Sequence, residues 1–600
     1  MIADKKNDEQ RNYRMTGKDW LLVFVLLAVY IPLSLFNLGS REVPETFWKP
    51  MQSGDSFIID FGQDYDISRI AFYPGIGNGE YYLDFYTEEW RPTGEIVLSQ
   101  ETVYFWHFPD ADNTGRYARL IALRPGGMLN ELAFFSEDSL EPLPIVAVFD
   151  EKIAPESQGS PKDLFDEQAT IPERPSFMTG MYFDEIYFAR TAFEHLNRLV
   201  PFDTAQPPLA KILIGLGILL FGMNPFGWRI VAAVIGMGMI PVVYLFGKRL
   251  FGKTEYAFLA AFFLTFDFMH FAHTRFATLE GFMVFFIILM YFFMYEFISR
   301  DFYTSNLRSL ITPLFFSGLF YGMASASKLN GIFAGIGLAV IFFWALWKNE
   351  RVYNAARKEQ KEITEGDQTA ETTRRERIVS RYPVNRNRIL SWCVVFFILV
   401  PLGVYFLSYI PVMLIPDHGF ADVIRYQTHM YRYHRFLQAT HPFASPWYEW
   451  PIMARPIWMY QGKELADGLI SSIVSFGNPA VWWGGFLTFF YVLWCTVKGK
   501  DRQMTFVLLA LASQFIPWML VPRLTFIYHY FASVPFLIFG LVFTLGKIEE
   551  RWRGGRSLVI LFGALTVGLF ALFYPILSGM IVERSYVATY LRWLPSWFFY

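Results

Sequence analysis

Long apolar runs fill most of this 600-residue chain from about residue 205 onward. With the run at 20–38 there are eleven, the others lying at 228–247, 257–274, 279–297, 311–327, 329–347, 389–411, 478–497, 504–521, 526–546 and 557–578. A helix needs about 20 apolar residues to cross the hydrocarbon core of a bilayer. The overall content of 54% hydrophobic and 18% charged residues agrees with repeated crossing. We therefore predict a polytopic α-helical membrane protein with eleven spans.

Basic residues between the runs give the orientation. If residues 1–19 form a cytoplasmic tail, the basic turns after 247, 297, 497 and 546 all face the cytoplasm, as the positive-inside rule requires. The charged stretch 348–388 then also lies inside, and its lack of apolar periodicity predicts a flexible connector. The run 212–223 is too short to cross and is predicted to lie at the outer interface.

Residues 40–150 have a different character, with short alternating segments separated by Gly and Pro turns that are typical of a soluble β-sandwich. The stretch 57–73, FIIDFGQDYDISRIAFY, resembles the opening of discoidin-type, galactose-binding-like domains, and 115–135 resembles their end. The resemblance implies an extracytoplasmic jelly roll that could bind a glycan. The alternative is a module that only covers the catalytic face. Residues 151–177 are predicted to form a linker.

Two adjacent carboxylates, Asp184 and Glu185, lie among aromatic residues in a juxtamembrane segment, 178–227, on the predicted outer face. Cations on outer tips run against the positive-inside preference, so each either anchors its helix at the headgroups or has a function. Five of them could face an anionic group at the interface: Lys211, Arg275, Lys328, Arg455 and Arg523. Cations can stabilise a departing lipid phosphate, and a carboxylate can act as the base toward an acceptor hydroxyl.

Several motifs then resemble the protein O-mannosyltransferase family. They are FDEIYFARTAFEHL, QPPLAKILIGLGILLFGMNPFGWR, HTRFATLEGF, HPFASPWYEWPIMARPIW and PRLTFIYHYFASVPFL, in this order between 178 and 578. The resemblance implies a GT-C fold with about eleven transmembrane helices, with the core at 228–578 and an outer loop at 412–477. It also implies an inverting transfer of a sugar, expected to be mannose, from a polyprenyl-phosphate donor to Ser/Thr hydroxyls of secreted proteins.

The same resemblance assigns roles to individual residues. Asp184 matches the catalytic acidic residue and Glu185 its partner, expected to position the acceptor. The positions expected to line the donor phosphate and sugar are Lys211, Arg275, Arg455, Arg523, Tyr528 and His529. Two departures from the family pattern, Gln206 and Glu280, bear on donor or acceptor selectivity.

Other functions and partners are less well supported. The same chemistry could act on a lipid or cell-wall polymer instead of protein. A transporter or flippase of lipid-linked glycans would be expected to show internal repeats and mid-span charges, whereas the sequence shows no repeat and its candidate charges cluster at one face. Neither His270 with His273 nor His429 with His434 has companions at ligand spacing, so no metal site is predicted, although the chemistry would be compatible with a divalent metal. We expect a multi-pass plasma-membrane enzyme with no nucleic-acid partner, a cytoplasmic amino terminus and an extracytoplasmic tail at 579–600.

Overall fold

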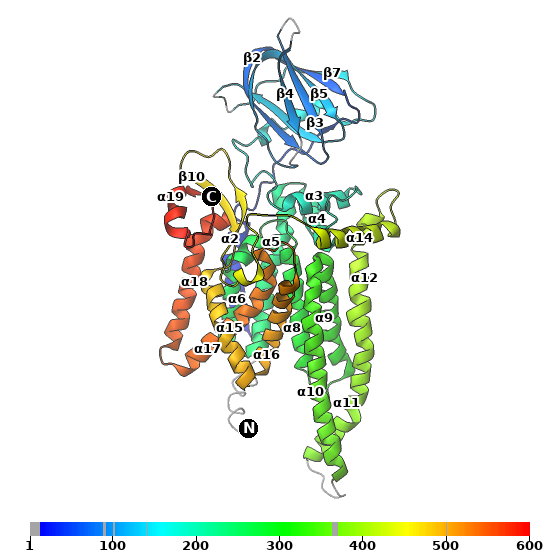
Figure 1. The fold of residues 1–600 in the computed structure, drawn as a ribbon, viewed down its shortest axis with the longest axis vertical. Helices are drawn as coiled ribbons and strands as arrows, with labels where there is room; N and C mark the ends of the chain where they lie inside the picture. The colour runs from blue at the N-terminus through cyan, green and yellow to red at the C-terminus, as the bar shows by residue number, and fades with distance from the viewer. Residues whose placement is uncertain are drawn as a thin grey trace.

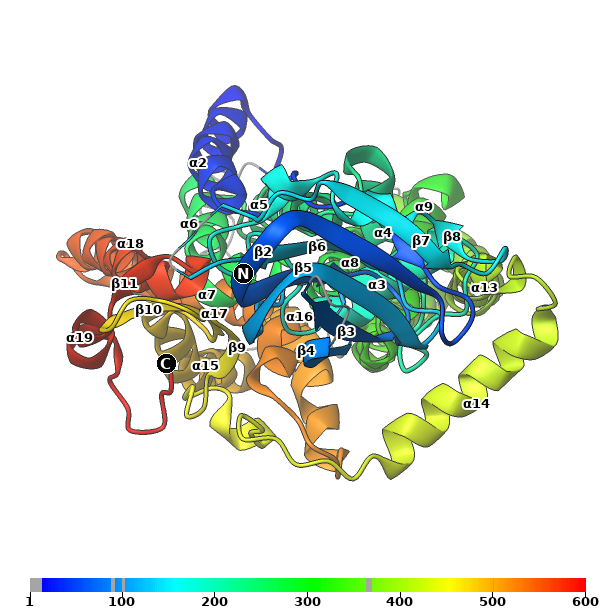
Figure 2. The same cartoon turned by 90° about the horizontal axis from the view of Figure 1, so that it is seen from above.

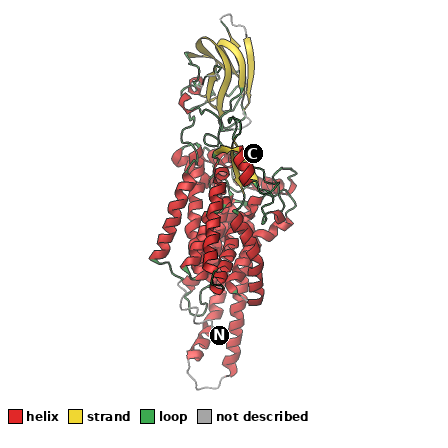
Figure 3. Ribbon diagram, turned by 90° about the vertical axis from the view of Figure 1, so that its left-hand side faces the viewer, coloured by secondary structure: helices red, strands yellow, loops and turns green. Residues whose placement is uncertain are grey.

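The computed structural model describes residues 13–87, 92–99, 103–137, 139, 141–362, 370–499 and 501–600. A β-rich module stands at one end of a long helical bundle, and the carboxyl terminus lies on the module side of that bundle (Figure 1). Strands are concentrated in the module, while helices make up nearly all of the rest (Figure 3). The predicted basic tail before residue 13 lies outside the described residues. The predicted fold class, a helical membrane protein with an amino-terminal β region, is confirmed.

Ten helical segments of the described chain are long and apolar enough to cross a membrane. They are α2 (Gly17–Leu35), α5 (Pro225–Phe251), α8 (Glu280–Ile298), α9 (Leu307–Ser327), α10 (Ala334–Glu362, preceded by a turn from Leu329), α11 with α12 (Ala370–Val394 and Val400–Leu407), α15 (Pro479–Gly499), α16 (Arg502–Phe515, extended by a turn to Leu520), α17 (Val534–Arg551, preceded by a turn from Ile527) and α18 (Gly555–Ser578). Each lies on one of the predicted apolar runs.

The eleventh predicted span, 257–274, is not one continuous helix. It is divided into α6 (Thr254–Thr265) and α7 (Phe268–His273). The break occurs at the buried Asp267, whose carboxylate accepts the His270 amide at 3.1 Å and the Trp482 indole N–H at 2.9 Å. A carboxylate that caps a new helix start ends the preceding helix, which the apolar pattern alone does not reveal.

The α6–α7 pair nevertheless runs from one side of the bundle to the other. Glu255, in the first turn of α6, lies 3.8 Å from Lys18 at the start of α2. Arg275, just after α7, donates to backbone carbonyls at the opposite end of α2. The broken pair therefore spans the length of α2, and the alternation of sides predicted from the basic turns is preserved.

The prediction that 348–388 forms a flexible connector is wrong. Its described residues continue α10 and α11 as a helical hairpin that projects beyond the bundle (Figure 1). Arg386 pairs with Glu350 at 2.9 Å, Arg375 with Glu359 at 3.2 Å, and the rings of Tyr353 and Tyr382 lie 5.6 Å apart. These side-chain contacts stabilise the two polar helices although neither has an apolar stripe here. The periodicity of apolar residues therefore did not predict the helices.

The module is an eight-stranded antiparallel sheet folded around its own core. Its strands are β1 (Trp48–Lys49), β2 (Ser56–Pro74), β3 (Glu80–Tyr86), β4 (Pro92–Ser99), β5 (Asp110–Arg124), β6 (Leu129–Phe135), β7 (Ala147–Lys152) and β8 (Gln158–Gly159). They follow the order β4-β3-β5-β2-β6-β1-β8, with β7 also paired to β2. The long β2 pairs with β7 over 56–60, with β5 over 56–69 and with β6 over 69–74, so its partners change along its length. The galactose-binding-like assignment remains a prediction.

Short elements cover the module side of the bundle. They are α3 (Glu185–Leu196), α4 (Leu209–Phe221), α13 (Ile410–Met413), α14 (Phe420–Phe436) and a three-stranded sheet of β9 (Ile457–Gln461), β10 (Leu469–Ser475) and β11 (Ile581–Glu583). Seen from above, α14 runs along one edge of the bundle, away from α2 and α18 (Figure 2). α4 is only 13 residues long and is not among the ten spans, in agreement with the predicted interfacial position.

Candidate active site

Asp184 occupies the turn that starts α3. Its backbone carbonyl accepts the first helical N–H groups, while the preceding residue, Phe183, has a left-handed φ of 49°. Within the described part of the chain, no donor forms a hydrogen bond with the Asp184 carboxylate, which is partly accessible. Burial, together with the negative charge of Glu280 and against the opposing effect of Lys328, raises the pKa of the Asp184 carboxyl to about 7. A carboxylate with free lone pairs and a pKa near neutrality is suited to accept a proton.

Glu185, the next residue, has the opposite environment. Its side chain is fully buried, and both oxygens pair with Arg229 of α5, at 2.7 Å to Nε and 2.6 Å to Nη2. The Glu185 carboxylate also accepts the amides of Tyr182 and Ala277. It is thus saturated with donors and faces no open space. This placement does not favour the predicted contact with the acceptor and instead favours a positioning role.

Arg229 completes this cluster by joining distant segments. Its remaining N–H groups donate to the carbonyls of Leu38, Phe177 and Gly180 at 2.7 to 2.9 Å. One guanidinium therefore ties the end of α2 to the segment that leads into Asp184. A buried pair that satisfies all its donors fixes geometry, at the cost of desolvating two charges.

A second ion pair, between Glu280 and Lys328, lies near Asp184. Glu280, at the start of α8, pairs with Lys328, which follows α9, and also accepts the Thr278 hydroxyl. The Lys328 ammonium lies 5.1 Å from the centre of the Tyr528 ring. The Tyr528 side chain interacts electrostatically with Asp184, Glu280 and Arg523, so these groups lie close to one another.

Arg523 supplies the other cation of this neighbourhood. It lies in the loop before α17, partly buried, and forms no hydrogen bond or ion pair with any described residue. Burial lowers the pKa of Arg523, but a guanidinium remains charged in proteins. Its charge reaches Tyr433 and His434 on α14, and burial together with Arg523 lowers the pKa of His434 to about 4. An unpaired, partly desolvated guanidinium is suited to bind an anion.

Lys211 does not lie free in this cluster. Its ammonium is fully buried and pairs with Asp203 at 2.9 Å. It also bonds the carbonyls of Asp203 and Gln206 and the hydroxyl of Tyr426 on α14. With its three protons used by protein acceptors, Lys211 has none left for the predicted phosphate contact. Its observed role is to hold α14 against the loop after α3.

Arg275 and Arg455 are also engaged elsewhere. The Arg275 guanidinium donates to the carbonyls of Ser34, Phe36 and Asn37, and thus caps the last turn of α2. Arg455 donates one N–H to the Ala444 carbonyl at 2.8 Å and is otherwise half-exposed. The geometry therefore argues against Arg275 as a phosphate ligand and leaves Arg455 at the periphery.

Tyr528 and His529 lie beside Arg523, as expected, but in different surroundings. Their ring centres lie 4.6 Å apart, and the Phe526 ring lies 5.3 Å from Tyr528 and 6.3 Å from His529, so the three rings form one cluster. His529 is buried, with Nδ1 2.9 Å from the Phe526 carbonyl oxygen and its ring against Trp450. We place Tyr528 in the cluster and His529 behind it as a support.

The sequence did not identify the partners of these charges. Arg229 carried one available signal, because it is a charged residue inside a predicted span. Lys328 had been one of five outer cations, but its pairing with Glu280 joins positions 48 residues apart. For metals, the one carboxylate group of the described chain that is compact enough to share a cation is Glu131, Asp166 and Glu167, in and beside the module. None of these residues lies in the Asp184 cluster.

Comparison with known proteins gives matches along most of the chain. Residues 219–415 match the family model described as dolichyl-phosphate-mannose-protein mannosyltransferase. Residues 419–597 match the model of the C-terminal four-transmembrane region of protein-O-mannosyltransferase. A polyprenol-phosphate-mannose–protein mannosyltransferase of Mycobacterium tuberculosis is 25% identical over 476 residues, which are 69% of this chain and 86% of that one.

Further matches are to proteins of the same family. The protein of the same description from Corynebacterium glutamicum is 25% identical over 454 residues, covering 65% of this chain and 81% of its own. Among solved structures, the S. cerevisiae protein O-mannosyltransferase Pmt1-Pmt2 complex bound to the sugar donor superimposes with a TM-score of 0.57 at 13% identity. The superposition covers 70% of this chain and 89% of that chain, and it shows a shared fold.

Proposed function

Because the chain belongs to the protein O-mannosyltransferase family, to which its residues 219–415 and 419–597 match, we propose that it transfers mannose from a polyprenyl-phosphate donor to an acceptor hydroxyl. It is a membrane-embedded glycosyltransferase. The observation that carries the proposed chemistry is the contrast at 184–185: the Asp184 carboxylate has no donor among the residues that the structure describes, whereas the Glu185 carboxylate is saturated with them. Relatives named polyprenol-phosphate-mannose–protein mannosyltransferase support mannose and a protein acceptor.

Asp184 acts as the general base. The acceptor O–H approaches the anomeric carbon of mannose, and its proton passes to a carboxylate oxygen of Asp184 as the new C–O bond forms. A pKa of about 7 is supportive, because such a group is substantially ionised at neutral pH and still basic enough to take the proton. The attack comes from the side opposite the phosphate, so the configuration at the anomeric carbon inverts.

Arg523 and Lys328 act on the leaving group. As the bond between the anomeric carbon and the phosphate oxygen breaks, its electron pair and negative charge pass to the phosphate. The N–H groups of Arg523, unbonded within the described part of the chain, can receive that charge, and Lys328 adds a second cation from across Tyr528. Glu280 keeps Lys328 in position without neutralising Arg523.

Two saturated networks hold this arrangement. The Glu185–Arg229 pair fixes the segment that ends in Asp184. The Asp203–Lys211 pair, with the Tyr426 hydroxyl, anchors α14 above the site and so places Tyr433 and His434 near Arg523. Such preorganisation lowers the cost of aligning the reacting groups when the donor binds.

The site faces the extracytoplasmic side of the plasma membrane in this proposal. α2 starts on the side of the α10–α11 hairpin, which is rich in Lys and Arg, whereas α3, which Asp184 caps, lies on the side of the β-module (Figure 1). Basic segments favour the cytoplasm. The β-module then stands outside, where a protein or glycan acceptor would approach.

The test uses purified full-length protein with polyprenyl-phosphate mannose and a Ser/Thr peptide, read by mass spectrometry of the peptide. Wild type should add one hexose per modified hydroxyl, and Asp184→Asn should be slower by about 10²- to 10⁴-fold. Asp417→Asn is the matched control, since this exposed residue on the same side already has the left-handed φ of 62° that Asn tolerates. An envelope polymer is tested in parallel. Transfer only to the polymer would overturn the assignment of protein as the acceptor. A wild-type rate in Asp184→Asn would overturn the assignment of Asp184 as the general base.

A further inference from the structure

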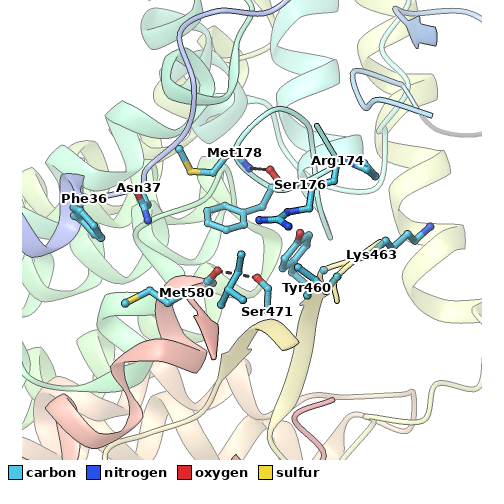
Figure 4. A pocket seen from close by; sticks show the side chains of 15 residues that line it. Phe36, Asn37, Arg174, Ser176, Met178, Tyr460, Lys463, Ser471 and Met580 are labelled. Atoms are coloured by element: carbon cyan, nitrogen blue, oxygen red, sulfur yellow. Dashed lines mark hydrogen bonds between the residues drawn. The ribbon is translucent and has the colours of Figure 1, made fainter. Parts of the chain in front are cut away.

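A half-open cavity of about 330 Å³ lies on the module side of the bundle, apart from the Asp184 cluster. Four segments meet there: the chain just after α2, the linker at 174–178, the hairpin of β9 and β10, and the chain just after α18. Figure 4 shows Arg174 directed toward the middle of this cavity, close to Tyr460, whereas the Lys463 side chain extends outward from the rim. Nothing in the proposed sugar transfer uses it.

The charge of the cavity is one-sided. Its lining includes Arg174 and Lys463 but no carboxylate. Neither cation has a hydrogen-bond or ion-pair partner among the described residues, and the nearby Glu464 lies instead 3.9 Å from Arg69. Polar groups of Asn37 and Tyr460 add further hydrogen-bonding capacity. An unpaired guanidinium in a concave site without acids favours an anion.

The height of the cavity in the membrane indicates which anion. Phe36, at the end of α2, and Met580 and Ile581, just after α18, line it and remain 54%, 36% and 42% exposed. Since α2 and α18 are both spans, this rim lies where the spans leave the hydrocarbon region. A soluble anion would gain nothing from such a rim, whereas a lipid places a phosphate beside apolar chains.

Exposed apolar side chains of the two spans offer a surface for those chains, with Ile31 of α2 and Leu565 of α18 remaining 37% and 50% exposed. Phe271 of α7 contacts Tyr30 of α2, with ring centres 6.4 Å apart, and Phe570 and Tyr574 of α18, at 5.2 and 5.6 Å. Largely buried aromatic side chains therefore connect α2 and α18 through α7, behind that exposed apolar surface. This combination is the typical pattern of basic pockets between transmembrane helices that hold lipid head groups.

We propose that this cavity binds the phosphate of an anionic phospholipid from the same leaflet, with Arg174 as the main contact and Lys463 as a second charge at the rim. The acyl chains lie against the outer ends of α2 and α18. The Tyr460 ring packs against Phe177 and Tyr182, at 5.3 and 5.8 Å, so a bound lipid also supports the segment that leads to Asp184.

The experiment measures lipid retention by native mass spectrometry of the delipidated full chain, titrated with phosphatidylglycerol, phosphatidylcholine or inorganic phosphate. Wild type should retain one phosphatidylglycerol that phosphatidylcholine does not replace. Arg174→Gln with Lys463→Gln should weaken this binding about tenfold or more, because each basic side chain near a membrane surface typically contributes about fivefold. The control, Arg198→Gln with Arg592→Gln, removes two exposed charges from the same face and should bind as wild type does.

A charge-preserving variant, Arg174→Lys with Lys463→Arg, separates loss of charge from loss of folding and should retain the lipid. Equal retention by the Gln variant and its control would overturn the proposal. So would equal binding of phosphatidylcholine, which would indicate a groove for any lipid. Displacement of phosphatidylglycerol by millimolar inorganic phosphate would show a site for a free anion instead of a lipid.

Discussion

Two clusters of charged groups lie on the module side of the bundle, and they differ in how completely they are paired. In the cluster around Arg229, every polar atom of Glu185 and every guanidinium nitrogen has a partner within the protein. In the cluster around Asp184, the carboxylate and the Arg523 guanidinium have none among the described residues. The two clusters adjoin at the peptide bond between 184 and 185. Saturated charges hold a structure in place, whereas unsaturated ones remain available for a substrate.

The largest expected effect breaks the saturated cluster. Arg229→Met leaves the Glu185 carboxylate buried without a cation, and removing one partner of a buried pair typically costs about 3–5 kcal/mol of stability. We expect poor yield of folded protein and a lowered melting temperature in detergent. The double variant Glu185→Gln with Arg229→Met should recover part of the loss. An Arg229→Met variant that melts like wild type would show that this cluster does not hold the fold.

Lys211→Met tests whether Lys211, which was predicted to contact the donor phosphate, has a structural role instead. The variant leaves Asp203 buried and unpaired and frees α14, so a loss of stability of about 3 kcal/mol is expected, close to that of Arg229→Met. The KM for the donor in the folded fraction should change little. A large rise in donor KM without a change in melting temperature would restore Lys211 to the donor site.

Arg523→Ala acts on the open cluster and should show the reverse pattern. Loss of the guanidinium should lower kcat/KM for the donor by about 10²-fold, through weaker binding and weaker stabilisation of the leaving phosphate. The melting temperature should remain near that of wild type, because no described residue depends on Arg523 for a hydrogen bond. Arg592→Ala is the control on the same face. An unchanged kcat/KM would remove Arg523 from the site.

The pH dependence gives a smaller but more specific effect. The base must be ionised, so kcat/KM should fall as pH drops through the Asp184 pKa of about 7, tenfold per pH unit below it. Glu280→Gln removes a negative charge that raises this pKa and releases Lys328, which lowers it. The acid limb should therefore move to lower pH. A limb that stays in place would show that another group controls it.

Much of the scaffold could be predicted from the sequence, because apolar runs and basic turns are local signals. Ten of eleven runs correspond to span-forming helices, and the family motifs identify the segment around Asp184. The break at Asp267 and the helical hairpin of α10 and α11 could not be predicted, since both depend on side-chain contacts between elements. The family resemblance also assigned substrate roles to Glu185, Lys211 and Arg275. Only the fold shows that their charges are already neutralised or bonded.

The most direct test compares Asp184→Asn with Glu185→Gln, measuring the single-turnover rate at saturating donor and the melting temperature of each purified protein. The account predicts opposite outcomes: Asp184→Asn loses about 10²- to 10⁴-fold in rate with its melting temperature preserved, whereas Glu185→Gln loses stability while its folded fraction still transfers mannose. An Asp184→Asn enzyme at the wild-type rate, beside a stable but inactive Glu185→Gln enzyme, would contradict it and assign the base to Glu185.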